Sequence, residues 1–498
     1  METLSHLYDG LSLLMGFTPL VVILAGVIVG ILAGAMPGIS PSMAVALLLP
    51  FSFGMSPSMG IVLLCAVYLA SNYGGSITAV MINTPGTPSA VVTAFDGYPL
   101  TRKGQAGTAL GVSLVSSVVG GFVGIIILVL FSAPLARMAL KFWPAEYFAL
   151  AILGLSTIAS LGGGRWLESF IAVMLGLLLN TIGLDPLSGV SRYTFDFIRL
   201  YDGFSFIPVL IGLFALSEVF MGIESGEVNR PPVLPEREKS PWPTLRDYLK
   251  LKFAMLRAGV VGTVIGVFPG AGGTIASFIA YDIEKRLNSD PDSFGKGNPF
   301  GVAAAEASNS SSVGGALVPL LTLGIPGSSS AAVLIGALMI HNLQPGPELF
   351  TKHPEIVYTL FSSLFVANIF LLFLGLLGAR LWIKAALIPK RLLYPMIFAF
   401  SFIGSYAVRS SVFDVGVCLA FGLLGWVLVR SKFPVSPIVL GMILGTMIEK
   451  NLRATLMMGG PALFLQRPLS LVLLALAFAS GVIPYLREQK RKKALRKS

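Results

Sequence analysis

The chain has 498 residues, of which 55% are hydrophobic and only 12% are charged, and its mean hydropathy is +0.83. A soluble protein carries about twice that charged fraction, so the composition excludes an ordinary soluble domain and predicts a membrane protein. The formal net charge of +11 does not indicate nucleic-acid binding, because the charges lie between apolar segments and in the C-terminal tail, without a nucleic-acid-binding motif.

The first predicted unit, residues 17–131, is apolar but interrupted. Its first helix is expected to break at Pro37-Gly38, because proline removes a backbone donor and clashes with the preceding turn. Further breaks are predicted at 73–76 and 83–89. The residues before the unit contain no Lys or Arg, so the first apolar segment is expected to be retained rather than cleaved as a signal peptide.

The rest of the chain divides by polarity into five further segments. They are connecting membrane helices at 132–223, a polar linker at 224–252, a second unit with broken helices at 253–380, C-terminal helices at 381–485 and a basic tail at 486–498. A membrane span needs roughly 20 apolar residues. We therefore predict an all-α, polytopic fold with about ten to twelve transmembrane helices plus re-entrant hairpins. The Lys and Arg residues of the tail place the C-terminus in the cytoplasm.

Short strings of Gly, Pro, Ser and Asn occur twice, in the same order, in the two units. The matched strings are Val29-Gly30, Gly34 and Pro37-Gly38 with Val261-Gly262, Gly266 and Pro269-Gly270, then Ala70-Ser71-Asn72 with Ala307-Ser308-Asn309, Gly74-Gly75 with Gly314-Gly315, and 84–90 with 325–331. Duplicated units with broken helices are typical of secondary transporters. We expect two pseudo-symmetric repeats, inverted relative to each other.

The residues at the breaks and in the Ser-Asn strings are neutral hydrogen-bond donors and acceptors. Helix N-termini with free N–H groups suit a carboxylate, and unwound carbonyls with amide or hydroxyl oxygens suit Na⁺. Such residues cannot perform general acid–base catalysis at neutral pH. They could instead serve packing alone, but their joint duplication favours a site. The expected substrate site comprises Pro37, Gly38, Ser71, Asn72, Gly74, Gly75, Ser76, Thr84, Pro85, Gly86, Thr87, Pro269, Gly270, Ser308, Asn309, Pro326, Gly327, Ser328 and Ser329, with Asn72, Asn309, Thr87 and Ser328 as candidate Na⁺ ligands.

Few charged residues lie near these strings. Glu306 directly precedes the second Ser-Asn string, where the first unit has Leu69. Its carboxylate either serves proton or cation coupling or lies at a helix N-terminus near water, and the sequence leaves both open. Asp96 is expected in an interfacial loop. Arg192 and Arg199 could attract an anion, but a solvated loop is favoured.

The strings around the breaks also form a recognisable set. They are Pro37-Gly38-Ile39-Ser40-Pro41, Ser71-Asn72-Tyr73-Gly74-Gly75-Ser76, Asn83-Thr84-Pro85-Gly86-Thr87-Pro88, Asp96-Gly97-Tyr98-Pro99-Leu100, Phe268-Pro269-Gly270-Ala271-Gly272 and Gly324-Ile325-Pro326-Gly327-Ser328. Together they resemble the large membrane subunit of tripartite tricarboxylate transporters, over about residues 20–453.

That resemblance implies a multi-pass protein of the bacterial inner membrane with an elevator-like architecture. Such a subunit acts with a small membrane subunit of about four helices and a periplasmic solute-binding protein. It imports tricarboxylates or dicarboxylates, citrate among them, and is driven by a cation gradient, Na⁺ or else H⁺. No cofactor is expected, and the lack of a G-x-x-x-x-G-K loop argues against an ATP-driven pump.

Other functional classes stay open at this stage. A stand-alone ion-coupled symporter for another small anion would need the same kind of site without the binding protein. A membrane enzyme would need Asp, Glu, His or a metal cluster in a polar cavity, and only Glu306 offers a start. An ion channel fits less well, because it does not explain the binding-protein partner that the resemblance implies. The absence of any large soluble domain argues against a non-transporting scaffold or sensor.

Overall fold

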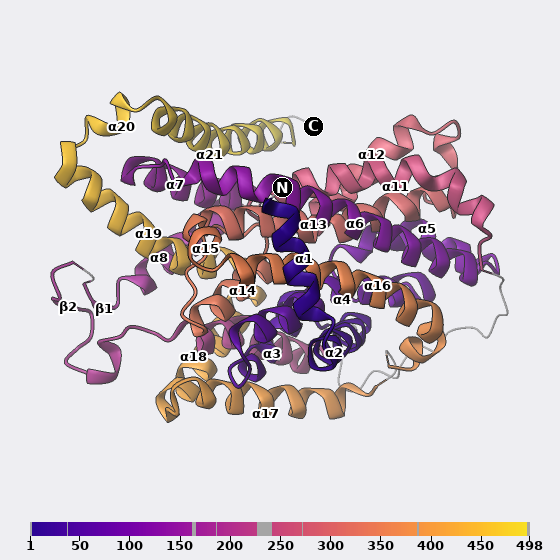
Figure 1. The fold of residues 1–498 in the computed structure, drawn as a ribbon, viewed down its shortest axis with the longest axis horizontal. Helices are drawn as coiled ribbons and strands as arrows, with labels where there is room; N and C mark the ends of the chain where they lie inside the picture. The colour runs from indigo at the N-terminus through magenta and orange to yellow at the C-terminus, as the bar shows by residue number, and fades with distance from the viewer. Residues whose placement is uncertain are drawn as a thin grey trace.

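The computed structural model describes residues 2–36, 38–161, 166–185, 187–226, 242–270, 272–385 and 388–495 (Figure 1). Its first part consists of six helices: α1 (Glu2–Leu14), α2 (Phe17–Ala35), α3 (Pro41–Ser52), α4 (Pro57–Ile82), α5 (Ala90–Arg102) and α6 (Ala106–Ala139). The chain re-enters a helix at α3 because the Ser40 hydroxyl accepts the backbone N–H of Met43 at 3.2 Å and Pro41 takes the first helical position. A helical hairpin therefore follows the first break.

The connecting part holds helices and the one β-ribbon of the described residues. The elements are α7 (Pro144–Leu161), α8 (Trp166–Asn180), β1 (Gly183–Leu184), β2 (Ser191–Arg192), η1 (Ile198–Leu200), α9 (Phe206–Ile211), η2 (Gly212–Leu216) and α10 (Ser217–Glu224). Strands β1 and β2 pair antiparallel, with Gly183 opposite Arg192. Residues 227–241 of the predicted linker lie outside the described part, and residues 245–252 already belong to the next helix.

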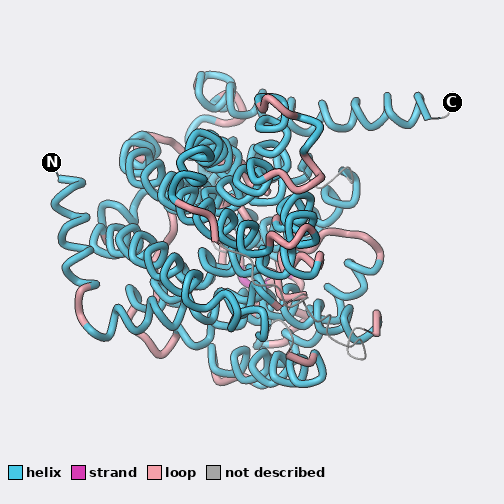
Figure 2. Tube along the Cα trace, turned by 90° about the vertical axis from the view of Figure 1, so that its right-hand side faces the viewer, coloured by secondary structure: helices cyan, strands magenta, loops and turns pink. Residues whose placement is uncertain are grey.

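The second broken unit follows the pattern of the first. It comprises α11 (Leu245–Gly266), α12 (Gly272–Leu287), η4 (Pro291–Ser293), α13 (Pro299–Leu323), α14 (Ser329–Ile340), α15 (Pro347–Lys352) and α16 (Pro354–Ala385). The C-terminal helices are α17 (Lys390–Arg409), α18 (Val412–Arg430), α19 (Ser436–Gly459), α20 (Leu463–Gln466) and α21 (Pro468–Leu495). In Figure 2 the two ends of the chain extend from opposite sides of the helical body.

The all-α, polytopic fold is confirmed. Seven described helices are long and apolar enough to cross a membrane, and four shorter helices are also apolar. The expected total of ten to twelve crossings stays a prediction. Helix α4 has a mean hydropathy of only 1.4, against 2.7 for α6, and its most apolar 18 residues are all buried inside the protein. It therefore belongs to the protein interior rather than to the lipid-facing surface.

The predicted break at 73–76 is wrong, because α4 runs without interruption through Tyr73, Gly74, Gly75 and Ser76. The glycines there permit close packing instead. A Cβ on Gly74 would lie 2.4 Å from the carbonyl oxygen of Ile31 in α2, so only glycine allows the two backbones to approach this closely. The break at the end of α4 is real: Asn83 adopts a left-handed conformation with φ 52°.

The repeat is present in the structure, but in a different register from the one that the strings suggest. Gly30 in α2 contacts Val67 and Ala70, whereas Gly262 in α11 contacts Ser308 and Ser311. Along α4 and α13 the equivalent positions are thus 241 residues apart throughout (67 to 308), while α2 and α11 keep the separation of 232 (30 to 262).

This register corrects the match between the two Ser-Asn strings. Asn309 is equivalent to Tyr68, Asn72 is equivalent to Val313, and Glu306 is equivalent to Cys65 rather than to Leu69. The residue identities misled because both helices carry small polar residues at several helical positions, so that a shift of one turn still produces matches.

The two repeats are intertwined rather than side by side. The long helix α6 of the first repeat packs most extensively on α13, and α16 of the second repeat packs on α4. Gly120 of α6 approaches Ala307, where a Cβ would lie 2.0 Å from the carbonyl oxygen. The Asn368 amide of α16 donates to the carbonyl of Val118 in α6 at 2.8 Å. Each repeat therefore completes the environment of the other repeat's buried helix.

Candidate functional site

The two buried helices α4 and α13 meet at their polar segments. The side-chain amide of Asn309 donates to the backbone carbonyl of Asn72 at 3.3 Å, and the Ser76 hydroxyl donates to a carboxylate oxygen of Glu306 at 2.5 Å. From the first contact to the second, the residue number rises along α4 and falls along α13. The two equivalent helices therefore run antiparallel where they touch. An inverted repeat requires this order.

Each of the two buried helices is wrapped at its end by a Pro-Gly loop. In the first repeat the Gly86 N–H donates to the carbonyl of Gly75 at 3.1 Å, and in the second the Gly327 N–H donates to the carbonyl of Ala316 at 3.4 Å. A Cβ on Gly86 would lie 2.0 Å from the carbonyl oxygen of Gly34. The glycines at these breaks are thus needed for backbone contact between three segments.

The loops that join α2 to α3 and α11 to α12 share a backbone feature. Gly38 has φ 94° and Gly270 has φ 81°, a region that side chains with a Cβ avoid. Both glycines are exposed, and the Gly270 N–H donates to the carbonyl of Gly327 at 3.2 Å. Pro37 lies outside the described residues, and Pro269 and Pro85 are half-buried.

Asn309 faces the start of α12 and the loop of the first repeat. A Cβ on Gly273 would lie 2.6 Å from Oδ1 of Asn309 and 3.5 Å from Cβ of Ser89. Oδ1 of Asn309 is buried and has no hydrogen-bond partner among the described residues. The hydroxyls of Thr87 and Ser89 lie 3.2 Å apart. Residues of both repeats therefore surround one buried, unsatisfied amide oxygen.

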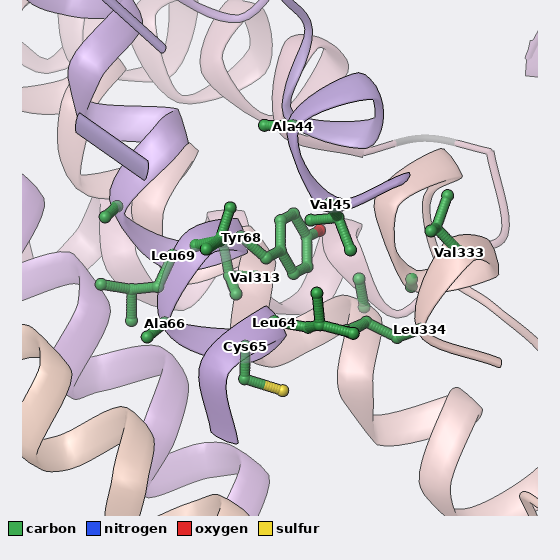
Figure 3. Packing of buried hydrophobic residues seen from close by; sticks show 14 of the residues in the cluster. Ala44, Val45, Leu64, Cys65, Ala66, Tyr68, Leu69, Val313, Val333 and Leu334 are labelled. Atoms are coloured by element: carbon green, nitrogen blue, oxygen red, sulfur yellow. The ribbon is translucent and has the colours of Figure 1, made fainter. Parts of the chain in front are cut away.

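Tyr68 occupies the equivalent position in the other repeat. Its hydroxyl lies 2.8 Å from that of Ser328, and its ring packs among Val45, Leu64 and Val313 (Figure 3). Ser328 also caps α14 by accepting the N–H of Ala331 at 3.1 Å. The sequence pattern did not reveal Tyr68, because an aromatic residue in an apolar run usually belongs to the core, and only the corrected register pairs it with Asn309.

The other expected site residues lie in varied surroundings. The hydroxyls of Ser71 and Ser308 donate to carbonyls of their own helices, at 3.0 Å and 2.8 Å. The Thr84 hydroxyl donates to the carbonyl of Ile82 at 3.2 Å. The Ser329 hydroxyl lies 2.6 Å from Ser436 of α19, away from the α4–α13 contact. Pro326 is buried within its loop.

Glu306 is fully buried and is surrounded by hydroxyl groups. Besides Ser76, Thr93 of α5 donates to the same carboxylate oxygen, and Ser117 of α6 donates to the other at 2.7 Å. All three hydroxyl residues are fully buried. The possibility that Glu306 lies at a helix terminus near water is therefore wrong, since α13 begins at Pro299.

Asp96 does not lie in an interfacial loop, as the sequence suggested, but in α5 with its side chain fully buried. One carboxylate oxygen accepts the backbone N–H groups of Gly295, Gly297 and Asn298 at 2.8–2.9 Å. The other accepts the Tyr281 hydroxyl at 2.8 Å. Partial burial and, after it, this hydrogen bond to the carboxylate raise the pKa of Tyr281. Asp96 thereby joins the first repeat to the insertion before α13.

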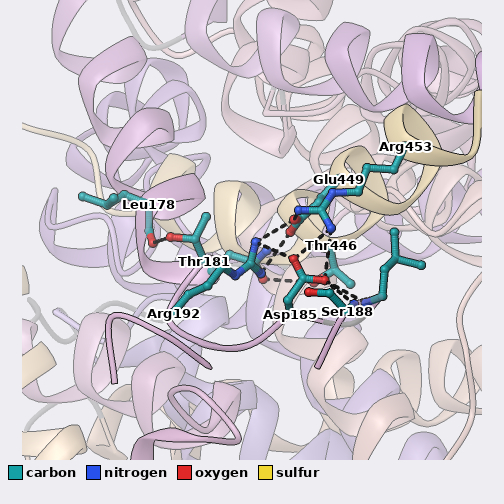
Figure 4. A network of polar contacts seen from close by, with 10 residues as sticks. Leu178, Thr181, Asp185, Ser188, Arg192, Thr446, Glu449 and Arg453 are labelled. Carbon is teal, nitrogen blue, oxygen red and sulfur yellow. Dashed lines mark hydrogen bonds and ion pairs between the residues drawn. The ribbon is translucent and has the colours of Figure 1, made fainter. Parts of the chain in front are cut away.

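Arg192 is paired, so it is not available as a free anion-binding residue. It lies 2.6 Å from Glu449 and 3.4 Å from Asp185, and Arg453 lies 2.8 Å from Asp185 (Figure 4). Backbone N–H groups of Ser188 and Leu187, together with Arg453, hold the pKa of Asp185 below its usual range. The network fixes the β-ribbon to α19. Arg199 lines a separate surface pocket beside Arg409.

The sequence is similar to those of known proteins. Residues 20–440 match the family model described as the tripartite tricarboxylate transporter TctA family. The chain belongs to the TctA family. It is 36% identical over 488 residues to an uncharacterized 52.8 kDa protein in the TAR-I ttuC' 3' region of Agrobacterium vitis, covering 98% of this chain and 97% of that protein. It is 35% identical over 227 residues to an uncharacterized protein in the TAR-II ttuC' 3' region of the same organism, covering 45% of this chain and 94% of that protein. No solved structure matches.

Membership of the TctA family confirms the resemblance of the sequence strings. The chain is thus the large subunit of a tricarboxylate transporter and a multi-pass membrane protein. Transport, rather than an enzymatic reaction, is the activity of this family. Within the described residues no group of three or more His, Cys, Asp or Glu side chains could hold a metal ion.

Proposed function

We propose that this TctA-family protein imports carboxylates, citrate-like tricarboxylates or dicarboxylates, across a bacterial inner membrane, using a cation gradient. A periplasmic solute-binding protein delivers the substrate, and a small four-helix subunit completes the membrane complex. The C-terminus lies in the cytoplasm, and the coupling ion is Na⁺, with H⁺ as the alternative. One block of helices moves relative to the other, as in an elevator.

The observation that carries the proposal is the pair of equivalent sites at the α4–α13 contact. One contains Asn309 with Ser89 and the start of α12, and the other contains Tyr68 with Ser328. Helix N-termini provide N–H donors and a partial positive charge for a carboxylate. The neutral Asn, Tyr and Ser groups add hydrogen bonds without fixing a permanent ion pair. A carboxylate held in this way can be released on the other side.

Uptake into proteoliposomes that hold this chain and its small partner subunit tests the proposal. An inward Na⁺ gradient is imposed, and the binding protein is added or omitted, with citrate and a panel of other carboxylates as substrates. Uptake that requires both the gradient and the binding protein is expected. Uptake without the binding protein would instead indicate a stand-alone symporter. Folded protein that takes up no carboxylate would refute the proposal.

Two substitutions test the location of the site. Tyr68→Phe keeps the ring and removes the hydroxyl that contacts Ser328, and Asn309→Ala removes the amide whose oxygen is unsatisfied. Because one hydrogen bond contributes about 0.5–1.5 kcal/mol, each change should reduce substrate affinity by about 2–10-fold. Tyr8→Phe is the matched control, since Tyr8 is 71% exposed. Unchanged uptake kinetics in both site variants would move the substrate away from the α4–α13 contact.

A further inference from the structure

The carboxylate of Glu306 lacks a positively charged partner among the described residues. It accepts hydrogen bonds from the hydroxyls of Ser76, Thr93 and Ser117, which come from α4, α5 and α6. Asp96 of α5 lies against Gly301, at the start of α13, and has its own hydrogen-bond donors. The phenol of Tyr73, on α4, also faces Glu306. Removing a lone carboxylate from water is very costly unless a cation or a proton neutralises it.

The atoms around Glu306 form an oxygen-only coordination set. Two carboxylate oxygens and three hydroxyl oxygens come from four different helices. Ser113, one turn before Ser117 on α6, also lies against the carboxylate, and its fully buried hydroxyl has no hydrogen bond of normal geometry within the described part of the chain. Carboxylate and hydroxyl oxygens are the ligands that hard cations prefer. This cluster of oxygens therefore has one member, the Ser113 hydroxyl, beyond those that the hydrogen bonds to Glu306 occupy.

The equivalent place in the other repeat is apolar. By the corrected register Cys65 stands where α13 has Glu306, and Leu317 and Leu334 stand where the first repeat has Ser76 and Thr93. Figure 3 shows Cys65 and Leu334 in this apolar cluster. The same fold is thus stable at this position without a carboxylate, so packing alone does not explain Glu306 and its hydroxyls.

We propose that Glu306, with Ser76, Thr93, Ser113 and Ser117, binds the monovalent cation that couples transport, with Na⁺ as the cation that the oxygen set fits. The assignment rests on the proposed function. It develops the cation-coupling role that the sequence left open for Glu306, and it locates the ion away from the four candidate Na⁺ ligands named from the repeated strings. Ser76 lies one turn from Asn72, and Glu306 lies one turn from Asn309. A cation here draws α4 and α13 together at the point where the substrate groups meet. Substrate and cation binding are linked through that contact.

Thermal unfolding of the purified full-length chain in detergent tests the assignment without any substrate. NaCl is titrated against choline chloride at constant ionic strength. A ligand that binds only the native state raises Tm with its concentration, so Tm of the wild-type chain should rise by several degrees with NaCl. Glu306→Gln should abolish this rise. Ser117→Ala should move its midpoint to about tenfold higher NaCl, the effect of about 1.4 kcal/mol.

Ser116→Ala is the matched control, because Ser116 is the neighbouring, equally buried serine of α6 and its hydroxyl makes no hydrogen bond among the described residues. Its NaCl response should equal that of the wild type. If Glu306→Gln fails to fold, the comparison of Ser117→Ala with Ser116→Ala still decides. An undiminished NaCl response in Glu306→Gln, or equal midpoints for the two serine variants and the wild type, would overturn a Na⁺ site here.

Infrared difference spectra distinguish a proton from Na⁺ as the bound cation. In Na⁺-free buffer, the wild-type chain should show a carboxyl C=O band that is lost as the pH is raised and that is missing in Glu306→Gln. A wild-type chain with neither a NaCl response nor this band would overturn the proposal. Cation binding in a chain that imports no carboxylate would overturn only the proposed function, since neither measurement uses substrate.

Discussion

Removal of the Asp96 carboxylate should destabilise the protein more than any other single change at the junction of α5 and the 295–298 loop. The carboxylate accepts three backbone N–H groups and one phenol hydroxyl. A hydrogen bond to a charged group contributes about 1.5–3 kcal/mol, and a buried donor left unsatisfied costs about 1–3 kcal/mol. Because the loop is partly exposed, water recovers some of this, and we expect Asp96→Ala to cost about 3–5 kcal/mol.

Two milder variants separate the contributions of the charge and of the phenol hydrogen bond to this loss of stability. Asp96→Asn keeps an oxygen for the three N–H groups but removes the charge, and should cost about 1–3 kcal/mol. Tyr281→Phe removes only the phenol hydrogen bond and should cost about 1 kcal/mol. In a large domain each kcal/mol lowers Tm by about 2–4 °C, so Asp96→Ala should lower Tm by at least about 6 °C.

The assay is thermal unfolding in detergent at a fixed scan rate, read by a fluorescent dye or by circular dichroism. Asp292→Ala is the control, since Asp292 is exposed in the same insertion and should leave Tm unchanged. The reasoning would be refuted if Asp96→Ala unfolded within about 2 °C of the wild type, or if Tyr281→Phe were the most damaging of the three changes.

Three other predictions concern the packing, the polar network and the arrangement of the repeats. Gly86→Ala should destabilise the folded protein by at least about 1–3 kcal/mol, because the added Cβ would lie 2.0 Å from a backbone oxygen. Gly416→Ala is the control, because the space around Gly416 is open and Tm should not fall. Equal Tm values for the two variants would contradict the close loop contact. Asp185→Asn should lower Tm near pH 7, because a carboxyl with a depressed pKa stabilises the fold above its unfolded-state pKa of about 3.9. The difference in Tm from the wild type should shrink as the pH falls below about 4. A difference in Tm that does not depend on pH would refute this. A disulfide should form on oxidation in a variant with Ser89→Cys and Gly273→Cys, made after replacement of Cys65 and Cys418 by Ala. The two Cβ positions lie 3.5 Å apart, and disulfides need about 3.5–4.5 Å. Absence of the cross-link on a non-reducing gel would contradict the contact between the repeats.

The sequence predicted the features that depend on local chemistry. The breaks at Pro37-Gly38 and after Asn83 follow from proline geometry and turn residues, and the duplication followed from ordered strings. The break at 73–76 failed because consecutive glycines inside a helix are compatible with a break and with close packing alike. Only the neighbouring backbone of α2 decides between the two.

The features that depend on tertiary contacts were not predictable. The hydroxyls around Glu306 come from helices between which the sequence shows no relation. Asp96 looked exposed because it is followed by basic residues, but its partners lie about 200 residues further on. The register of the repeat needed the contacts of Gly30 and Gly262, since residue identity alone favoured pairing Asn72 with Asn309.

The exchange of long helices between the repeats has a consequence for biosynthesis. Helix α4 is completed at Ile82, but α16, which covers it, begins only at Pro354. At about 5–20 residues per second, the ribosome needs about 15–50 s to reach that point. During this interval the side of α4 that packs on α16 has no finished protein surface to face. Substitutions on α16 that leave the completed fold intact should therefore reduce the yield of inserted protein, because they weaken its packing on α4, a helix made nearly 300 residues earlier.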